Sequence, residues 1–379
     1  MKFTKEIKVQ LERIFQDFKL TDPSSETKLD EKTVISISRE DFPVESILLF
    51  TLHKICGFRT ISRWDKMHWG IIFEYKGAVN LISSHKFGLR LYSERIADVE
   101  AIQKELINKL KKNIKFIEKN ILNQYAENQV ALNNFTIPNL FHKLSGQYYY
   151  FRDQSKKNFK KEIDNVIKNK DFSSMLNTFF AKRDLEQYAV YNSLAMIDSY
   201  FSRLEHILVL ALPFSENKKE YDIKKFIGEF WSKKYSEVFD LSNPNSKRIH
   251  DELTLIKEKY RNTFAHGGFE KKGQSFHFHL ENYGVVPATM SDYKDSVHFN
   301  FIPLNESEFE NICLFFDEVD NFFKENLEVA WMFCNSGLDL VMDDKSLSQL
   351  LKKAEDIDVF GDWLDSENEH LCNYINANY

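Results

Sequence analysis

The sequence predicts a multi-domain, mainly α-helical protein that begins with an α+β domain. Three observations support this fold class. The chain has 379 residues, a length that favours more than one domain. Strand-like alternation is concentrated near the N-terminus, whereas the remainder mostly shows apolar residues at helical spacing. Hydrophobic residues make up 43% and aromatic residues 15% of the chain, which is ample for packed cores.

Residues 1–95 are predicted to form the α+β domain. The run 33–38 alternates like a strand, and 44–56 has helical spacing. A β-hairpin is expected around Lys76-Gly77, with one further strand after it. The domain has no phosphate-binding loop and no metal motif, so we expect it to recognise a partner or to hold an assembly together. The expected strands of the hairpin and after it cover residues 69–75, 78–83 and 87–92.

Residues 96–184 are predicted to form a basic helical arm, with breaks marked by Pro138 and Gly146. Between Lys104 and Asp171 there are fourteen Lys and Arg against seven acidic residues, interleaved with aromatic residues. Such a segment is a candidate surface for a polyanion, and an ordinary solvated helical face is the alternative. The candidate contact residues are Lys111, Lys112, Lys115, Lys156, Lys157, Lys160 and Lys161.

Residues 185–335 are predicted to form a bundle of four amphipathic helices. The acidic segment 336–379, with ten acids against three lysines, is expected to be a helical tail that could cover a basic surface until displaced. The four bundle helices are expected at about 186–212, at about 222–239, from about 246 onward, and at about 307–333.

A β-hairpin is expected in an insertion at about 269–304, because 276–280 and 297–301 both alternate with period two. Direct pairing of these runs would place polar residues together on one face. Three histidines there are candidate zinc ligands, and a merely solvated strand face is the alternative. The residues concerned are His277, His279, His298 and Asn300.

Composition also limits where the protein is expected to act. The four cysteines are widely separated, which favours reduced thiols over disulfides or a cysteine zinc site. The N-terminus lacks an apolar signal core, and the longest apolar run, at 206–214, is too short to cross a bilayer. We therefore expect a cytoplasmic protein without a membrane partner.

The most informative motif ends the third bundle helix, where Arg261, Asn262 and His266 fall within six residues. Arginine can bind phosphate oxygens with two N–H groups, and an imidazole titrating near neutrality can move the proton of a ribose hydroxyl. Asn262 and His266 are four apart and share a helical face, and Gly267-Gly268 is expected to end the helix just after the histidine. A capping histidine beside an exposed arginine is the alternative.

The same spacing occurs once more, at Arg63 and His68. That segment has no helical periodicity to direct its side chains, so we interpret it as coincidental. Spacing alone therefore carries little weight, and the helical setting of the second motif is what distinguishes it.

In this setting, the segment resembles the signature of the HEPN superfamily (higher eukaryotes and prokaryotes nucleotide-binding domain). Its ribonucleases carry an arginine, four to six further residues and a histidine at the end of a helix in a small all-α bundle. Arg261, Asn262 and His266 match this pattern, and the resemblance covers roughly 150 residues. Gly268 stands where HEPN toxins paired with a nucleotidyltransferase antitoxin carry a tyrosine, which argues against regulation at that position.

The resemblance implies cytoplasmic, metal-independent RNA cleavage, without a cofactor, in antiviral defence, abortive infection or toxin-mediated growth arrest. A homodimer would build one composite site, and an antitoxin or an activating phage factor would be a further partner. Asp198 and Glu205 on the first bundle helix are candidates to position Arg261, although solvent-facing acids are the alternative. The seven lysines listed above would then contact RNA. A non-catalytic HEPN module that binds nucleotide, nucleic acid or a partner protein is the second functional hypothesis.

Overall fold

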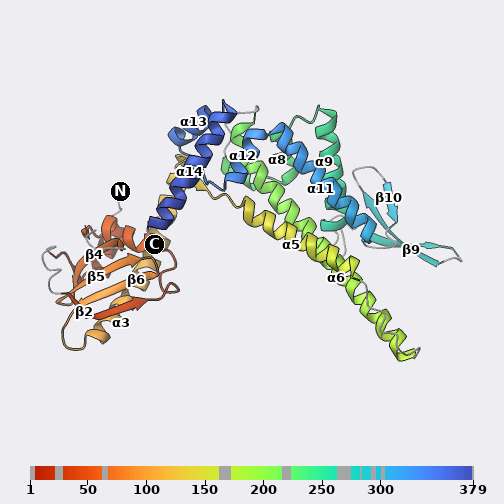
Figure 1. The fold of residues 1–379 in the computed structure, drawn as a ribbon. Helices are drawn as coiled ribbons and strands as arrows, with labels where there is room; N and C mark the ends of the chain where they lie inside the picture. The colour runs from red at the N-terminus through yellow and green to blue at the C-terminus, as the bar shows by residue number, and fades with distance from the viewer. Residues whose placement is uncertain are drawn as a thin grey trace. The chain divides into compact units, whose positions relative to one another are not determined.

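The chain divides into two compact units in a computed structural model, and each is described by itself (Figure 1). The first unit comprises residues 1–133 with 369–379, and the second comprises 134–368. The structure is mostly helical, with small antiparallel sheets. The structure describes residues 5–21, 29–61, 67–161, 172–215, 223–262, 275–281, 284–291, 296–299 and 304–377.

The first unit is built on an antiparallel sheet with the strand order β1-β4-β5-β6-β2, and β3 pairs with β4. Helices precede, interrupt and follow the strands in the chain. The helices are α1 (Lys5–Ile14), α2 (Glu45–Leu49), η2 (Phe50–Ile55), α3 (Val99–Ile117), η3 (Glu118–Leu122) and α4 (Asn123–Ala131), and the strands are β1 (Phe18–Lys19), β2 (Leu29–Ile37), β3 (Thr60–Ile61), β4 (Met67–Tyr75), β5 (Ala78–His85) and β6 (Gly88–Glu94).

The predicted hairpin around Lys76-Gly77 is confirmed, because β4 and β5 pair in register up to Tyr75 opposite Ala78. Both turn residues have positive φ, 51° for Lys76 and 82° for Gly77. Two successive residues of this kind form the two-residue turn whose twist matches that of paired strands. The predicted strand at 33–38, the helical segment at 44–56 and the strand at 87–92 are also present, as β2, as α2 with η2, and as β6.

Helix α3 packs into the core of the first unit rather than forming part of a separate arm. Its Leu106 and Leu110 are fully buried in one cluster with Ile71 and Phe73 of β4. The predicted arm at 96–184 is therefore wrong as a single domain, since its first part belongs to the sheet domain and the rest to the second unit. Apolar residues at helical spacing show that a helix buries one face, but they do not identify the core that receives it.

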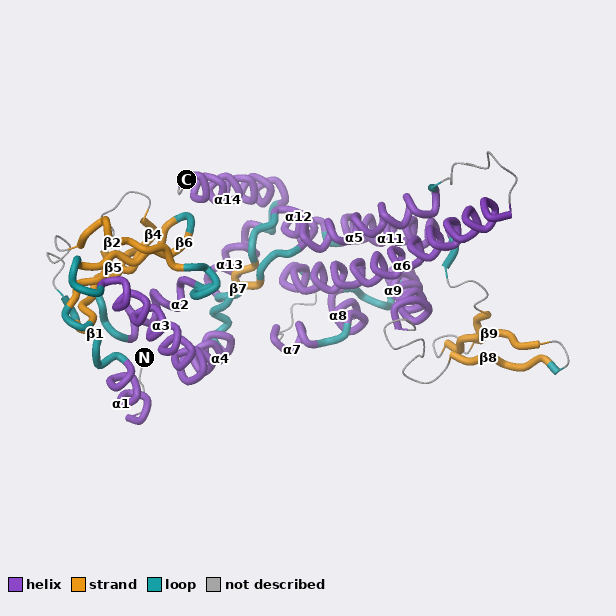
Figure 2. Tube along the Cα trace, turned by 90° about the horizontal axis from the view of Figure 1, so that it is seen from below, coloured by secondary structure: helices purple, strands orange, loops and turns teal. Residues whose placement is uncertain are grey.

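The second unit is a helical bundle in which α5 and α6 run side by side over much of their length (Figures 1 and 2). Gly146, which we expected to mark a break, lies inside α5. The helices are α5 (Phe141–Lys160), α6 (Phe172–Ala211), η4 (Leu212–Phe214), α7 (Ile223–Gly228), α8 (Trp231–Val238), α9 (Pro244–Ile256), η5 (Lys257–Asn262), α11 (Glu306–Asn326), α12 (Glu328–Ser336), α13 (Asp344–Lys353) and α14 (Ile357–Ala377), and the strands are β7 (Thr136–Ile137), β8 (Ser275–Leu280), β9 (Gly284–Ser291), β10 (Ser296–Phe299) and β11 (Leu340–Val341). Residues 369–377 of α14 belong to the first unit.

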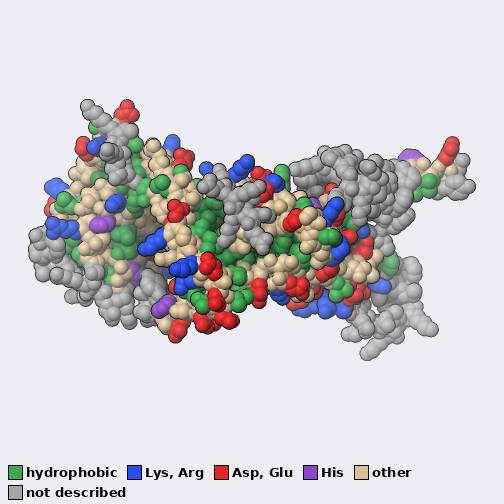
Figure 3. Space-filling model, turned by 90° about the horizontal axis from the view of Figure 1, so that it is seen from above, with side chains coloured by type: hydrophobic (Ala, Val, Ile, Leu, Met, Phe, Trp, Pro, Cys, Tyr) green, Lys and Arg blue, Asp and Glu red, His purple; other side chains and the backbone are tan. Residues whose placement is uncertain are grey.

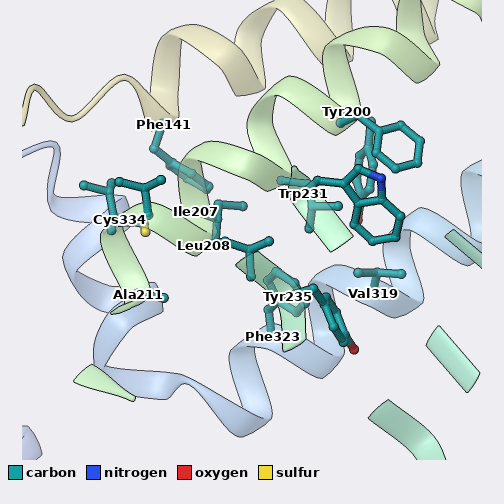
Figure 4. Close-up of a cluster of buried hydrophobic side chains, with 14 of the residues drawn as sticks. Phe141, Tyr200, Ile207, Leu208, Ala211, Trp231, Tyr235, Val319, Phe323 and Cys334 are labelled. Atoms are coloured by element: carbon teal, nitrogen blue, oxygen red, sulfur yellow. The ribbon is translucent and has the colours of Figure 1, made fainter. Parts of the chain in front are cut away.

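The bundle core is rich in aromatic side chains, which come from several helices, α5, α6, α8 and α11 among them (Figure 4). The rings of Tyr200 on α6 and Phe316 on α11 are stacked, with centroids 3.6 Å apart and planes 4° apart. Trp231 and Tyr235 of α8 join the same cluster. This core holds α6 in a defined orientation, and α6 carries the two acids of the candidate site.

Two of the predicted bundle helices are each broken in two. Phe230, with φ −67° and ψ 152°, is extended and separates α7 from α8. Leu327, with φ −136° and ψ 45°, separates α11 from α12. The apolar spacing continues across both breaks because both pieces of each helix face the same core, so the spacing did not reveal them. The first bundle helix also begins earlier than predicted, at Phe172.

The insertion contains three strands rather than a hairpin of two. β9 lies between β8 and β10, so the two predicted strands do not pair with each other. The strand was missed because it contains Pro287, a residue that argues against a central strand. Pro287 lies opposite His277 of β8, and the described residues of β10 pair with Ala288–Ser291.

The acidic tail is largely integrated into the second unit. β11 pairs with β7, and Phe360 and Leu364 of α14 are buried in the bundle core. The prediction of a helical tail is confirmed for α13 and α14. The idea of a tail that is simply displaced is wrong for this part, since displacement would expose core side chains to water.

Candidate functional site

The candidate site is assembled on one side of α6. Helix α5 covers the other side, where the Ser155 hydroxyl donates a 2.7 Å hydrogen bond to the Ala189 carbonyl and the Tyr148 and Tyr200 rings are 5.2 Å apart. Asp198 follows Ala189 by nine residues, which at about 100° per residue is about two and a half turns. Asp198 therefore lies on the side of α6 opposite α5.

Arg261 is held against this side of α6 by both predicted acids. Its Nε donates a 2.6 Å hydrogen bond to Asp198 Oδ1, and its Nη1 is 3.9 Å from Glu205 Oε1. The guanidinium carbon also lies 5.7 Å from the centroid of the Phe201 ring, on the same face of α6. The structure thus brings together three of the predicted site residues, from segments more than fifty positions apart in the sequence.

Two lysines that were not predicted also belong to this cluster. Lys234 of α8 makes a 3.0 Å ion pair with Glu205 Oε2. Lys257 of η5 lies over the Phe201 ring at 5.9 Å and over the Trp231 ring at 5.5 Å. Phe201 therefore supports two cations, Lys257 and Arg261, that come from the same short helix. Such an arrangement of cations on aromatic faces favours a site for an anion.

Solvent access varies sharply across the cluster. The Lys234 side chain is 5% exposed, Glu205 is 30% exposed, Arg261 is 26% exposed and Asp198 is 61% exposed. The charged pairs thus extend from the bundle interior to the surface. Asp198 is the most exposed of these four side chains.

Arg261 is carried by a π-helical segment, η5, which directly continues α9. Ile249, Leu253 and Ile256 of α9 and Tyr260 of η5 are all buried. A π-helical turn is wider than an α-helical turn, and such turns are common at functional sites. Here it brings Lys257 and Arg261, four residues apart, over the same ring.

Of the other predicted catalytic residues, Asn262 is the last residue of η5, whereas His266 lies outside the described residues. The expected Gly267-Gly268 helix end lies outside them as well, as does Arg63 of the coincidental motif. His68 is in β4 of the first unit. The structure therefore describes the arginine and its acids, and the histidine remains a prediction from the sequence.

The seven predicted RNA-contacting lysines are divided between the two units. Three lie on α3 in the first unit, where Lys111 is paired with Asp41. Four lie on or next to α5, on the side of α6 away from Asp198, and Lys160 is 3.4 Å from Glu310. On the face drawn in Figure 3, acidic and basic side chains lie side by side over the described surface.

The three histidines of the insertion lie on two strands separated by β9. His277 and His279 are opposite Pro287 and Val285, and His298 is opposite Thr289. Within the described ranges, no cluster of three or more His, Cys, Asp or Glu side chains is placed to hold a metal ion. All four cysteines are free thiols.

A further ion pair, which was also not predicted, lies in the bundle core next to the site. Arg203 is 2% exposed and donates a 2.8 Å hydrogen bond to Asp320 of α11, which also accepts a 3.2 Å bond from the Tyr200 hydroxyl. Arg203 Nε and Nη1 have no hydrogen-bond acceptor and instead face aromatic rings, including those of Phe141 and Trp331. Burial raises the pKa of Asp320, while Arg203 opposes that rise.

The signals for these additional residues differ in kind. Lys257 is four residues before Arg261, so helical spacing alone could have identified it. Lys234 and Arg203 carried no such signal, because lysine and arginine are usually exposed and only the assembled core shows that they are buried.

Comparison with known proteins gives no further guide to this site. No described helix is long and apolar enough to cross a membrane. No protein-family model, curated protein or solved structure matches the chain.

Proposed function

We propose that this protein is a metal-independent endoribonuclease of the HEPN type, which cleaves single-stranded RNA at a site centred on Arg261. The observation that supports this most is the placement of Arg261 at the end of a bundle helix, partly exposed and fixed by two acids and an aromatic ring. An arginine held in this way is prepared to bind a phosphate without first losing side-chain freedom.

In the proposed reaction, the ribose 2′-hydroxyl attacks the adjacent phosphorus and the 5′-oxygen of the next nucleotide leaves. His266 moves the proton between these oxygens, and Arg261 stabilises the negative charge that develops on the phosphate. Asn262 orients the phosphate or the histidine. Before RNA binds, Asp198 and Glu205 position the arginine, and neither touches the reacting atoms in this scheme.

Two copies of the chain would supply an acid and a base on opposite sides of one phosphate. We therefore propose a homodimer that acts in antiphage defence or toxin-mediated growth arrest, with an antitoxin or a phage factor controlling it. This part of the proposal rests on the resemblance of the Arg261–His266 segment to the HEPN signature.

Induced expression in a bacterial host tests the proposed function without knowledge of the RNA target. We expect the wild-type chain to arrest growth, and Arg261→Ala and His266→Ala to abolish the arrest at equal expression. Arg248→Ala is the matched control, because this arginine lies on α9 and pairs with Glu318 at the surface. It should arrest growth like the wild type. Growth arrest that persists in both site variants would contradict the proposal.

A further inference from the structure

We propose that Asp198 is a displaceable latch on Arg261, meaning a carboxylate that occupies the guanidinium until a ligand replaces it. Lys234 is the positioning residue that prevents Glu205 from acting as a second latch. The ligand that displaces Asp198 would be a phosphodiester of single-stranded RNA. This inference rests on the proposed function, because it concerns the availability of Arg261 for phosphate.

The two acids beside Arg261 differ in how they contact it. Asp198 accepts a 2.6 Å hydrogen bond from Nε, whereas Glu205 Oε1 is 3.9 Å from Nη1, which is too far for a hydrogen bond. Asp198 therefore occupies a donor of the guanidinium, and Glu205 contributes only its charge. A phosphate that binds the Nε edge of the guanidinium through two parallel N–H groups needs this same N–H, so phosphate and Asp198 compete for that edge.

Exposure separates the two acids further. Asp198 is 61% exposed, so its carboxylate can move into water when a phosphate arrives. An exposed ion pair of this kind contributes little to stability, and its displacement costs correspondingly little. The latch can therefore open without disturbing the bundle.

Glu205 is restrained from the other side by Lys234, whose side chain is 5% exposed. A buried ammonium group is costly unless a counter-charge stays beside it, and Glu205 Oε2 is that counter-charge at 3.0 Å. Each carboxylate oxygen thus faces a different cation. Lys234 holds Glu205 at a distance from Arg261 and neutralises most of its repulsion toward an incoming phosphate.

The test measures binding of the full-length protein to a fluorescently labelled single-stranded RNA in which every ribose carries a 2′-O-methyl group. This probe cannot undergo 2′-hydroxyl attack, so binding is separated from cleavage. Anisotropy at fixed salt gives the Kd. We expect Asp198→Asn to bind about two- to fivefold more tightly, which corresponds to the loss of one exposed ion pair that competes with the ligand. Glu186→Gln, an exposed acid elsewhere on α6, should change the Kd by less than about 1.5-fold.

Lys234→Met should weaken binding by about fivefold or more, because the freed Glu205 carboxylate then pairs with Arg261. The double variant Lys234→Met/Glu205→Gln removes both charges, and its Kd should return to within about twofold of the wild type. A lysine with only a structural role would not be rescued by the second substitution. The double variant also leaves no unpaired buried charge, so it keeps the test valid if the single variant folds poorly.

The outcomes distinguish this inference from the proposed function. If Arg261→Gln binds the probe as tightly as the wild type, both are overturned. If binding depends on Arg261 but Asp198→Asn does not tighten it, or the double variant is not rescued, the inference alone is overturned. Tightening by Asp198→Asn together with rescue in the double variant supports it.

Discussion

At the scale of single residues, the site combines cations and acids that differ mainly in burial. Arg261 lies between an exposed acid and a half-buried one, and the bundle core contains the buried pair Arg203 and Asp320. The resemblance to the HEPN signature led us to expect Asp198 and Glu205 beside Arg261. It could not predict Lys234, since its burial depends on how α8 packs against α6.

The buried pair gives a prediction about stability. Asp320→Ala should lower the free energy of unfolding by about 3–5 kcal/mol, because it leaves Arg203 buried among aromatic rings without a counter-charge. Urea unfolding followed by circular dichroism measures the change.

The matched control is Glu318→Ala, which removes the surface partner of Arg248 on the same helix, α11. It should cost no more than about 1 kcal/mol. Equal losses in the two variants would show that burial does not govern the Arg203–Asp320 pair.

At the scale of elements, α6 organises the second unit, since α5 packs on one side and Arg261 on the other. The sequence predicted this helix and its apolar stripe, but it did not predict the breaks at Phe230 and Leu327. The spacing of apolar residues indicates which side of a helix is buried. It does not reveal a break when the helical segments before and after the break bury the same side.

One contact between α6 and the start of α5 is sensitive to pH. The Leu140 backbone N–H donates a 2.9 Å hydrogen bond to His206 Nε2, so the imidazole is neutral, and burial lowers the pKa of His206 below its usual value of 6.5. Because the folded state takes up this proton less readily than the unfolded state, the stabilisation is complete above pH 6.5 and is lost as the pH falls below it.

His206→Gln keeps a hydrogen-bond acceptor but does not titrate in this range. Between about pH 7.5 and about pH 5.5, the wild type should therefore lose more unfolding free energy than the variant, as measured by urea unfolding at each pH. Parallel losses in the two proteins would rule out a titrating role for His206.

At the scale of the whole molecule, the two units have separate apolar cores. One core contains residues between Phe15 and Ile114, and the other contains residues between Ile137 and Leu364. The sequence predicted an N-terminal α+β part and a later bundle. It placed the boundary incorrectly, because α3 and α5 have the same amphipathic pattern but pack in different cores.

Separate cores predict that the fragment 134–368 folds alone. Its circular dichroism spectrum should be strongly helical, and it should unfold in one cooperative transition. A fragment that ends at Asn335 should not fold, because it lacks Phe360, Leu364 and the strand β11 that pairs with β7. Cooperative unfolding of the shorter fragment would contradict the role assigned to the C-terminal segment.

The most direct measurement of the central claim is the cleavage of single-stranded RNA by the purified protein in excess chelator, with the product ends identified by mass spectrometry. The account predicts 2′,3′-cyclic phosphate and 5′-hydroxyl ends. It also predicts that the rate falls by about 10²–10³ in Arg261→Ala and by about 10²–10⁴ in His266→Ala, with folding intact. Undiminished cleavage in both variants, or products ending in a 5′-phosphate, would contradict it.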